Sequence, residues 1–446
     1  MNNGKLRIAM VSDFFHPVVG GVENHIYMLG VNLLQRGHKV IMITHSHPPD
    51  RVGIRHLVPG LKVYHIPFPS IASSATLPNF FTLLPYLRTI LLRERIQLVH
   101  GHASLSSMAH EAILHAHHMG VRTVLTDHSL FGFDDAATIL TNKLLLGVLK
   151  NADAVICVSH TGRENTALRA ELLQKRWKSL NVIPNAIVTE KFKPAPRSLS
   201  NDTPGTITIV VISRLAYRKG VDLLVATAPR VCREFPNVRF IVGGDGPKMI
   251  EVLQMQEKHL LQDRIILLGS VRHTDVRDVL VQGSIYLNTS LTEAFGIGLL
   301  EAACTGLYVV STLVGGVPEV LPNDMISFAK PDEDDLFRAL SEAIAIVSAE
   351  SPDPWRAHDR IKGMYDWADV AERTERVYRA ALVSEPIDLW TRIVRTFEVG
   401  RLAGFIYIII LAVDCFFFKI LEWTMPRSQL DYVDDEELGK TDNSVD

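Results

Sequence analysis

Short apolar runs alternate with amphipathic helical patterns along the first 385 residues, and this alternation is typical of βαβ units and parallel sheets. Two series of strands are predicted. The strands of the first series are Leu6–Val11, Lys39–Thr44, Leu61–Ile66, Leu98–His100, Thr123–Thr126 and Ala154–Val158. The strands of the second series are Thr206–Ser213, Val238–Val242, Ile265–Leu268, Ile285–Asn288 and Tyr308–Ser311. The pattern predicts an α/β chain with two doubly wound domains.

The boundary between the two series is predicted from composition. Residues 193–205 (KPAPRSLSNDTPG) are rich in Pro, Ser and Asn, which is typical of a linker. We therefore expect an N-terminal Rossmann-like domain over residues 1–192, a linker over 193–205 and a second Rossmann-like domain over 206–385.

The pattern changes beyond residue 385. Residues 402–421 (LAGFIYIIILAVDCFFFKIL) are almost wholly apolar, and a helix of this length spans roughly 30 Å, the thickness of the bilayer's hydrocarbon core. We expect a transmembrane helix there. Asp414 interrupts the stretch, and a carboxylate inside a membrane is costly, so the alternative is a buried helix of a globular domain.

Two segments flank this stretch. In residues 386–401, apolar side chains recur at helical spacing with arginines between them, which is typical of an amphipathic helix. Such a helix can lie on a membrane surface or pack against the protein body, and the sequence leaves both open. Residues 422–446 are acidic and are expected to form a solvated tail.

Charge and cysteine content exclude several classes of protein. Lys and Arg number 46 against 49 Asp and Glu, a net charge of −3, so no basic excess favours a nucleic-acid partner. The four cysteines are far apart in sequence and lack the paired spacing of metal sites or disulfide frameworks. The N-terminus runs directly into a predicted strand without an apolar signal core, so we expect it on the cytosolic side.

The first candidate site follows the first predicted strand. Gly20 and Gly21 precede a helix expected to open at about Asn24. Paired glycines let backbone approach a phosphate at a helix N-terminus, although they also simply shape turns. The loop lacks the G-x-G-x-x-G fingerprint, so a dinucleotide cofactor is not expected.

The second candidate site is spread over the second half of the chain. Arg214 and Lys219 follow the strand Thr206–Ser213, and one guanidinium with one ammonium suits a diphosphate that gains charge as it leaves. Glu293 and Glu301 stand eight positions apart around a glycine turn. If that turn opens a helix, Glu293 can contact a sugar hydroxyl, and the free N–H groups of the helix can bind a phosphate. Glu301 can then hold a ribose diol.

These motifs resemble family 4 of the retaining glycosyltransferases, which have the GT-B fold. The resemblance extends over about residues 5–385, and its specific part is the E-x7-E motif with R-x4-K upstream. Longer local matches resemble the members of the family that make the first intermediate of GPI anchors by transferring N-acetylglucosamine from UDP-GlcNAc to phosphatidylinositol. Those matches are residues 11–17, 20–25, 50–55, 126–132 and 182–186.

The resemblance implies two Rossmann-like domains facing a cleft, with roles for named residues. Glu293 would meet the hexose hydroxyls and Glu301 the uridine ribose, while Arg214 and Lys219 would hold the diphosphate. The remaining donor-site residues it implies are Gly20, Gly21, Ala294, Phe295 and Gly296, with His128 facing the donor sugar.

The resemblance also implies how the reaction runs. Neither a cofactor nor a metal is expected, because cations of the protein neutralise the diphosphate. The histidines His100, His102, His115, His117 and His118 lack the ligand spacing of metal motifs. Asp127 is not expected to act as a nucleophile, since the favoured account is same-face attack with the leaving phosphate taking the acceptor's proton.

The expected partners are UDP-GlcNAc, phosphatidylinositol, the endoplasmic reticulum membrane and other subunits of a membrane complex. The catalytic domains would then be cytosolic, and the acceptor pattern at Asn201 would carry no glycan. The alternative is another membrane-tethered family 4 transferase, such as a mannosyltransferase, that acts on a different lipid. A GT-B phosphorylase is not favoured, because that chemistry uses a pyridoxal-phosphate lysine and no segment here resembles its site. A non-catalytic scaffold is less consistent with the four charged residues of the second site.

Overall fold

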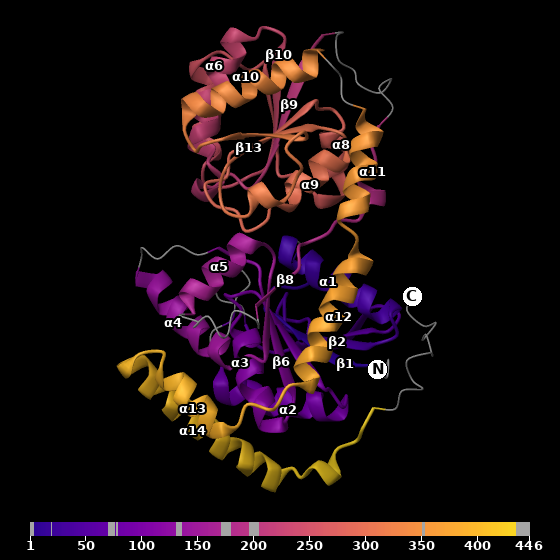
Figure 1. The fold of residues 1–446 in the computed structure, drawn as a ribbon, viewed down its shortest axis with the longest axis vertical. Helices are drawn as coiled ribbons and strands as arrows, with labels where there is room; N and C mark the ends of the chain where they lie inside the picture. The colour runs from indigo at the N-terminus through magenta and orange to yellow at the C-terminus, as the bar shows by residue number, and fades with distance from the viewer. Residues whose placement is uncertain are drawn as a thin grey trace. The chain divides into compact units, whose positions relative to one another are not determined.

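The computed structural model describes residues 4–18, 20–69, 76, 79–130, 136–170, 180–195, 205–349 and 353–433. The chain forms two compact units. Unit 1 contains residues 1–183 together with 367–446, and unit 2 contains residues 184–366. Figure 1 shows the elements of each unit.

Unit 1 is built on one eight-stranded sheet in the order β3-β4-β2-β1-β5-β6-β7-β8. All neighbouring strands are parallel except β3, which pairs antiparallel with β4. The strands are β1 (Arg7–Val11), β2 (Lys39–His45), β3 (Gly53–Val58), β4 (Leu61–Ile66), β5 (Leu98–His102), β6 (Arg122–Asp127), β7 (Ala154–Cys157) and β8 (Leu180–Val182). Every residue of β2 and of β5 is buried, as expected of inner strands that helices cover on both faces.

The helices of unit 1 come from both ends of the chain. They are α1 (Gly21–Gln35), α2 (Phe80–Arg93), α3 (Ser107–Ala116), α4 (Ala136–Asn151), α5 (His160–Arg169), α12 (Trp367–Val383), α13 (Leu389–Phe397) and α14 (Arg401–Thr424). A short 3-10 helix, η1 (His117–Met119), extends α3.

Unit 2 is built on a six-stranded sheet that is parallel throughout, in the order β11-β10-β9-β12-β13-β14. Its strands are β9 (Ile207–Ile212), β10 (Val238–Gly243), β11 (Ile265–Gly269), β12 (Ile285–Asn288), β13 (Tyr308–Thr312) and β14 (Ile326–Ala329). Its helices are α6 (Val221–Glu234), α7 (Met249–Lys258), α8 (Val276–Leu280), α9 (Ile297–Cys304), α10 (Glu333–Ala349) and α11 (Pro354–Met364). One continuous core of apolar side chains from β9, β10, α6 and α10 holds these elements together.

The two units meet the expectation of two doubly wound sheets, but the chain divides differently from the predicted ranges. Residues 367–385 pack with unit 1 because α12 binds α1 and the sheet there. Glu375 pairs with Arg36 at 2.8 Å, and the hydroxyl of Tyr378 lies 2.6 Å from Nδ1 of His100. The chain first passes from unit 1 to unit 2 after Ile183, which is before the expected linker. Residues 196–204 of that linker lie outside the described part of the chain.

Three strands were not predicted, namely β3, β8 and β14. Each of them lies at an edge of its sheet. In β3 the first four residues are exposed, so the sequence carries no apolar signal there. Helix α1 also begins at Gly21, three residues earlier than the predicted opening at Asn24.

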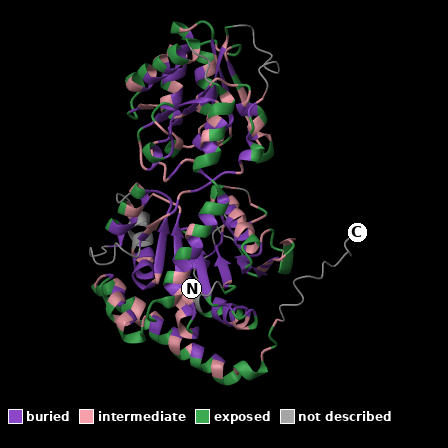
Figure 2. Cartoon of the chain, turned by 45° about the vertical axis from the view of Figure 1, so that its right-hand side comes forward, coloured by how far each residue is buried: buried purple, intermediate pink, exposed green. Residues whose placement is uncertain are grey.

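The C-terminal helices pack along unit 1. α13 contacts α4 and α14, and α14 contacts α2 and α4. α14 is the described helix long and apolar enough to cross a membrane by length and composition, with a mean hydropathy of 2.3 over its best window. Figure 2 shows buried and exposed residues interleaved along both helices.

Candidate functional site

The candidate diphosphate-binding residues of unit 2 follow the carboxyl end of β9. The chain leaves the strand through Arg214, whose side chain is exposed, and forms a 3-10 turn, η5 (Tyr217–Lys219), before α6 begins. The turn presents Lys219 toward the next strand of the sheet, β12. Parallel sheets bind ligands at this edge, where loops after neighbouring strands converge.

Lys219 and Glu293 form an ion pair. The Nζ atom of Lys219 lies 2.6 Å from Oε2 of Glu293, and the two side chains are 35% and 20% exposed. Gly220 makes this approach possible, because its φ is +65° and a Cβ there would lie 1.8 Å from the carbonyl oxygen of Thr289. Thr289 fixes the turn from the other side, since its hydroxyl donates to the carbonyl of Lys219 at 2.7 Å.

Glu293, Ala294, Phe295 and Gly296 form the turn that opens α9. Gly296 has a φ of +94° and is the residue before the helix, while Phe295 is buried against Tyr365. The N–H of Leu299 donates to the carbonyl of Gly296 at 3.0 Å. The N–H groups of Ile297 and Gly298 precede it, and N–H groups at the start of a helix are suited to bind an anion. Ala294 and Phe295 therefore place Glu293 and the helix N-terminus side by side.

Glu301 lies in α9, just over one turn from its start. Burial raises the pKa of Glu301 to about 7. Nearby Tyr286 donates its hydroxyl to the carbonyl of Ile212 at 3.2 Å. Glu301 can therefore change charge near neutral pH, and the carboxylate form would accept two hydroxyl donors from a diol.

A glycine-rich segment, residues 243–247, supports the Arg214 loop. A Cβ on Gly244 would lie 1.8 Å from the carbonyl oxygen of Ser213, so only glycine fits. The backbone N–H of Leu215 donates to the carbonyl of Asp245 at 2.9 Å. This close backbone packing fixes the direction in which Arg214 leaves the strand.

Unit 1 holds the other predicted residues. Gly20 immediately precedes α1 in an extended conformation, and Gly21 is the first residue of that helix. A Cβ on Gly20 would lie 2.4 Å from Oε2 of Glu23, so the carboxylate of Glu23 folds back over this turn. Burial raises the pKa of Glu23.

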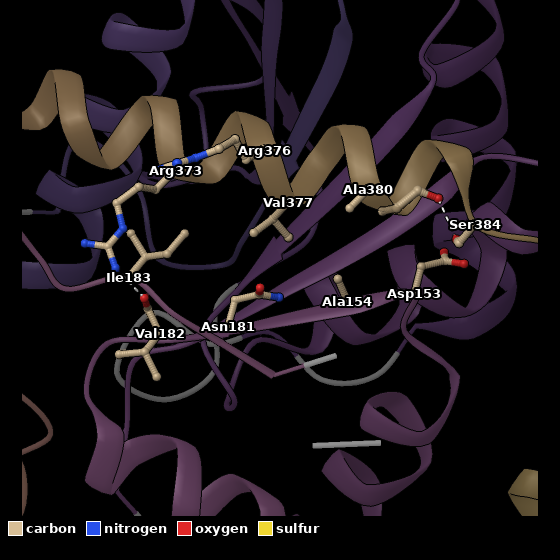
Figure 3. Close-up of a pocket in the computed structure, with 11 residues that line it drawn as sticks. Asp153, Ala154, Asn181, Val182, Ile183, Arg373, Arg376, Val377, Ala380 and Ser384 are labelled. Carbon is tan, nitrogen blue, oxygen red and sulfur yellow. Dashed lines mark hydrogen bonds between the residues drawn. The ribbon is translucent and has the colours of Figure 1, made fainter. Parts of the chain in front are cut away.

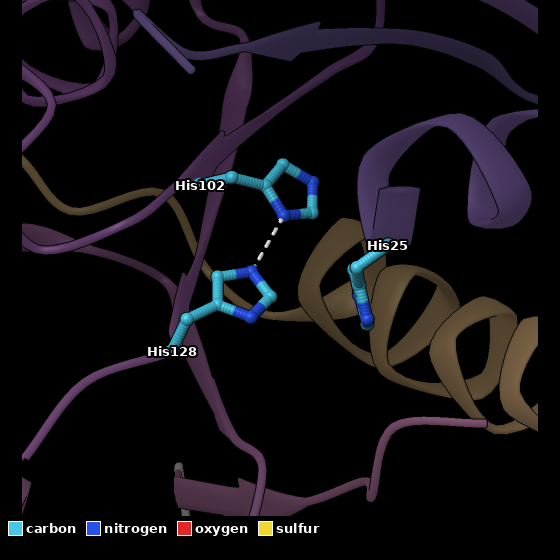
Figure 4. Close-up of side chains that lie close together, drawn as sticks. All are labelled: His25, His102 and His128. Atoms are coloured by element: carbon cyan, nitrogen blue, oxygen red, sulfur yellow. Dashed lines mark hydrogen bonds between the residues drawn. The ribbon is translucent and has the colours of Figure 1, made fainter. Parts of the chain in front are cut away.

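His128 follows β6 and lies in a cluster with two other histidines (Figure 4). Its Nε2 atom is 3.3 Å from Nδ1 of His102, at the end of β5, and its ring lies edge-on to that of His25 in α1, 4.7 Å away. Burial, with a smaller contribution from nearby His100, lowers the pKa of His128 to about 3. The imidazole is therefore neutral at physiological pH.

The carboxylate of Asp127 is occupied by structural partners. Oδ2 accepts from Arg169 at 2.6 Å and from Thr166 at 2.8 Å, while Oδ1 accepts from the N–H of Ser129 and the hydroxyl of Ser104. An acid with both oxygens bound in this way is a poor nucleophile. Its contacts instead hold the loop that carries His128.

The cluster of His25, His102 and His128 was not predicted as a group. Their ring nitrogens lie within 4.8 Å of one another, so the cluster has donor atoms that could hold a metal ion. His102 was considered for a metal only together with His100, and His25 only as part of a longer sequence match. The sequence signal that could have grouped them is the position of each histidine, at the end of a strand or near the start of α1. These positions come together only when the sheet is folded.

The described part of unit 1 has a separate pocket of about 400 Å³ (Figure 3). It lies between α12 and the β7–β8 edge of the sheet, and Arg373 on its rim donates to the carbonyl of Val182 at 2.8 Å. None of the predicted site residues lines it.

The fold and the motifs define a glycosyltransferase of the GT-B class. The structure resembles the sucrose-phosphate synthase of Thermosynechococcus elongatus, with a TM-score of 0.68 and 19% identity, covering 85% of this chain and 100% of that one. It also resembles Anabaena HepE in complex with UDP, with a TM-score of 0.65 and 16% identity, covering 84% of this chain and 100% of that one. The family described as "Glycosyl transferases group 1" matches residues 206–345.

More similar relatives narrow the class. The family described as "PIGA (GPI anchor biosynthesis)" matches residues 45–135. The chain is 52% identical over 422 residues to the phosphatidylinositol N-acetylglucosaminyltransferase gpi3 subunit of Schizosaccharomyces pombe, covering 95% of this chain and 91% of the relative. Phosphatidylinositol N-acetylglucosaminyltransferase subunits of Arabidopsis thaliana (50% identical, 97% and 94% covered) and Homo sapiens (46% identical, 95% and 86% covered) also match. The chain therefore belongs to the GPI3 family of phosphatidylinositol N-acetylglucosaminyltransferase subunits.

Proposed function

We propose that the chain is the catalytic subunit that transfers N-acetylglucosamine from UDP-GlcNAc to phosphatidylinositol with retention of configuration, the first step of GPI-anchor biosynthesis. The observation that carries the proposal is the ion pair of Lys219 with Glu293 beside the start of α9, in a chain 46–52% identical to subunits of that name. The similarity extends over 95% of the chain, which supports a shared substrate pair.

The donor would bind to unit 2. Arg214 and Lys219 would hold the diphosphate, together with the N–H groups at the start of α9. Glu293 would accept from the hexose hydroxyls, and Glu301 would accept from the ribose diol. As the bond to the sugar breaks, negative charge grows on the leaving diphosphate, so fixed cations there lower the barrier more than they strengthen ground-state binding.

The transfer itself would take place without a protein nucleophile. The bond between the sugar's anomeric carbon and the diphosphate oxygen breaks, the inositol oxygen bonds to the same face, and the hydroxyl proton passes to the leaving phosphate. His128, neutral because its pKa is about 3, would serve as a hydrogen-bonding partner of the donor sugar rather than as an acid. This role needs no proton exchange with the imidazole.

The acceptor places the reaction at a membrane. We infer that the protein is attached to the endoplasmic reticulum membrane through its C-terminal helices, with both units on the cytosolic side where nucleotide sugars are available. Relatives of the chain are named as subunits, which supports assembly with further subunits. The acceptor pattern at Asn201, which lies outside the described residues, would then never meet the lumenal glycosylation machinery.

The test uses membranes from cells in which this chain replaces the endogenous subunit. Radiolabelled UDP-GlcNAc should label phosphatidylinositol, and the label should be lost when Lys219 is replaced by Ala. The alternative is a different nucleotide sugar and lipid, so membranes are also supplied with labelled UDP-glucose and GDP-mannose. Labelling of another lipid from one of those donors, without labelling from UDP-GlcNAc, would overturn the proposed substrate pair.

A further inference from the structure

Two arginines lie at one end of the sheet of unit 1. Arg51 is in the loop that follows the carboxyl end of β2, and Arg55 is in the edge strand β3. Both belong to the sequence match over residues 50–55, which supplies none of the candidate-site residues described above. The carboxyl end of β2 is at the same edge of the sheet as that of β6, which His128 follows. Parallel sheets bind ligands at this edge, so Arg51 is placed to contact one.

The side chain of Arg51 is held in place by His65, a buried residue of β4. The Nδ1 atom of His65 lies 3.3 Å from the carbonyl oxygen of His45, so Nδ1 carries the proton and donates it. Nε2 is then the unprotonated nitrogen, and it accepts from Nε of Arg51 at 3.3 Å. Burial, with smaller contributions from Arg51 and Arg55, lowers the pKa of His65. The imidazole therefore stays neutral and keeps its acceptor for Arg51.

The Nη groups of Arg51 are left for a ligand. Among the described residues, no carboxylate forms an ion pair with Arg51 or Arg55, and nothing accepts a hydrogen bond from Nη of Arg51. Partial burial of a cation without a counter-ion costs free energy, and a bound anion would remove that cost. The two Nη groups form a planar fork, which matches the oxygens of a phosphate or carboxylate.

The groups next to Arg51 are imidazoles. Burial, with a smaller contribution from Arg51, lowers the pKa of His16, which follows β1, so this ring is close to the guanidinium. At the end of β2, the rings of His45 and His47 lie 6.1 Å apart. Neutral imidazoles do not compensate the charge of Arg51, and they can hydrogen-bond to hydroxyl groups of a ligand. The surroundings therefore suit a ligand with one negative charge and several hydroxyls.

We propose that Arg51, oriented by His65, binds the phosphodiester of the acceptor lipid, with Arg55 as a second and more exposed cation. The inference deepens the proposed function, on which it rests for the identity of the acceptor. The donor's diphosphate would be bound by cations of unit 2. The phosphodiester is the only charge of phosphatidylinositol, and the inositol ring supplies the hydroxyls. A cation at this edge of unit 1 would therefore recognise the acceptor.

The spacing of the strands suits such a headgroup. The strands β2, β1, β5 and β6 are consecutive in the sheet. Neighbouring strands lie about 4.8 Å apart, so the ends of β2 and β6 are separated by roughly 14 Å. The inositol ring would lie between a phosphate bound to Arg51 and a sugar beside His128. By holding the phosphate, Arg51 would determine which side of the ring faces the sugar.

The test measures the KM for the acceptor separately from the KM for the donor. The complex that contains the full chain is solubilised in detergent and supplied with a dissolved short-chain phosphatidylinositol, which removes any contribution of adhesion to a membrane. Arg51→Gln should raise the KM for phosphatidylinositol by about 10-fold to 100-fold, because charged hydrogen bonds are lost. The KM for UDP-GlcNAc should not change. An unchanged KM for phosphatidylinositol would overturn the proposal.

Two further variants separate this role from a general effect on the fold. Arg376 is an exposed arginine of α12 that lines the separate pocket of unit 1, and Arg376→Gln should leave both KM values unchanged. Arg51→Lys keeps the charge but loses the fork, so the KM for phosphatidylinositol should rise by only about threefold to tenfold. This variant decides the question if Arg51→Gln does not fold. Equal effects of Arg51→Gln and Arg376→Gln would contradict a specific site.

A competition experiment shows which part of the ligand is recognised. Glycerophosphoinositol, the headgroup with its phosphodiester, should inhibit the wild-type enzyme competitively against phosphatidylinositol, and Arg51→Gln about tenfold more weakly. Inositol without phosphate and inorganic phosphate without the ring should each inhibit the wild type at least about tenfold more weakly than glycerophosphoinositol. If inositol inhibits as well as the diester, the phosphate is not recognised. If inorganic phosphate does so, the site binds anions in general and the assignment to the lipid is wrong.

These outcomes are distinguishable from a failure of the proposed function. A wild-type complex that labels phosphatidylinositol from UDP-GlcNAc, with the same acceptor KM in Arg51→Gln, would contradict only the phosphodiester site. A wild-type complex that labels a different phospholipid from another donor would contradict the proposed function. The KM of Arg51→Gln for that phospholipid would still decide whether Arg51 binds a phosphodiester.

Discussion

Replacing Lys219 by Ala separates catalysis from stability at the candidate donor site. The ammonium lies 2.6 Å from Glu293, but the two side chains are 35% and 20% exposed. A partly exposed pair of this kind contributes about 0–1 kcal/mol to folding. For a unit of this size we expect the midpoint of thermal unfolding to fall by at most about 2–4 °C.

The effect on turnover should be much larger. If Lys219 stabilises the charge that grows on the leaving diphosphate, its loss should lower kcat by about 10²-fold to 10³-fold, which is about 2.7–4 kcal/mol in the transition state. The KM for UDP-GlcNAc should rise less than kcat falls, because the ground-state diphosphate carries less charge than the leaving group. The assay is initial-rate transfer of labelled sugar to phosphatidylinositol in membranes with matched amounts of protein.

A matched lysine serves as the control. Lys362 also forms an ion pair in unit 2, with Glu190 at 3.4 Å, but lies in α11 and outside the candidate site. Lys362→Ala should keep full activity. Full activity of Lys219→Ala at normal expression would refute the assignment, and so would a loss of activity that merely follows a loss of folded protein.

Three further predictions concern pH and backbone geometry. Because burial raises the pKa of Glu301 to about 7, the carboxylate that would accept from the ribose diol is lost as the pH falls below 7. UDP should therefore bind more weakly there, by up to about tenfold per pH unit. In calorimetry, Glu301→Gln should remove that pH dependence. Gly220→Ala should destabilise the protein by more than about 2 kcal/mol in thermal unfolding, because the φ of +65° is strained for alanine and its Cβ would overlap the carbonyl of Thr289. Burial alone would raise the pKa of Glu375, but hydrogen bonds, the largest from Arg36, lower it to about 2. Glu375→Gln should therefore destabilise the protein above pH 4.5. The difference in stability from wild type should vanish as the pH falls toward 2.

The inner strands could be predicted because each is a short apolar run between helical patterns. β9 and β12 were placed within one residue of their observed ends, and the candidate residues after them follow directly. Edge strands such as β3 are half-exposed, so their sequences lack that signal. The sequence could therefore indicate where the strand-end loops lie, but not every strand that frames them.

The sequence best indicates which candidate residues lie together where those residues are near one another in the chain. Glu293 and Gly296 belong to one turn, and spacing alone suggested that the turn opens a helix. The cluster around His128 draws His25 from α1 and His102 from β5, which are 77 residues apart in sequence. Only the strand order β1-β5-β6 brings those elements together.

The C-terminal helix shows why hydropathy cannot decide topology by itself. A helix that crosses a bilayer and a helix that lies between a protein surface and lipid both need apolar side chains on every face. Asp414 is the exception in the apolar stretch of α14, because its cost inside a membrane was clear from the sequence, whereas its partners were not. His115 and His118 lie almost 300 positions earlier and were considered only as metal ligands. Because these contacts form only when α14 packs against α3 and η1, no pattern within α14 itself could predict them.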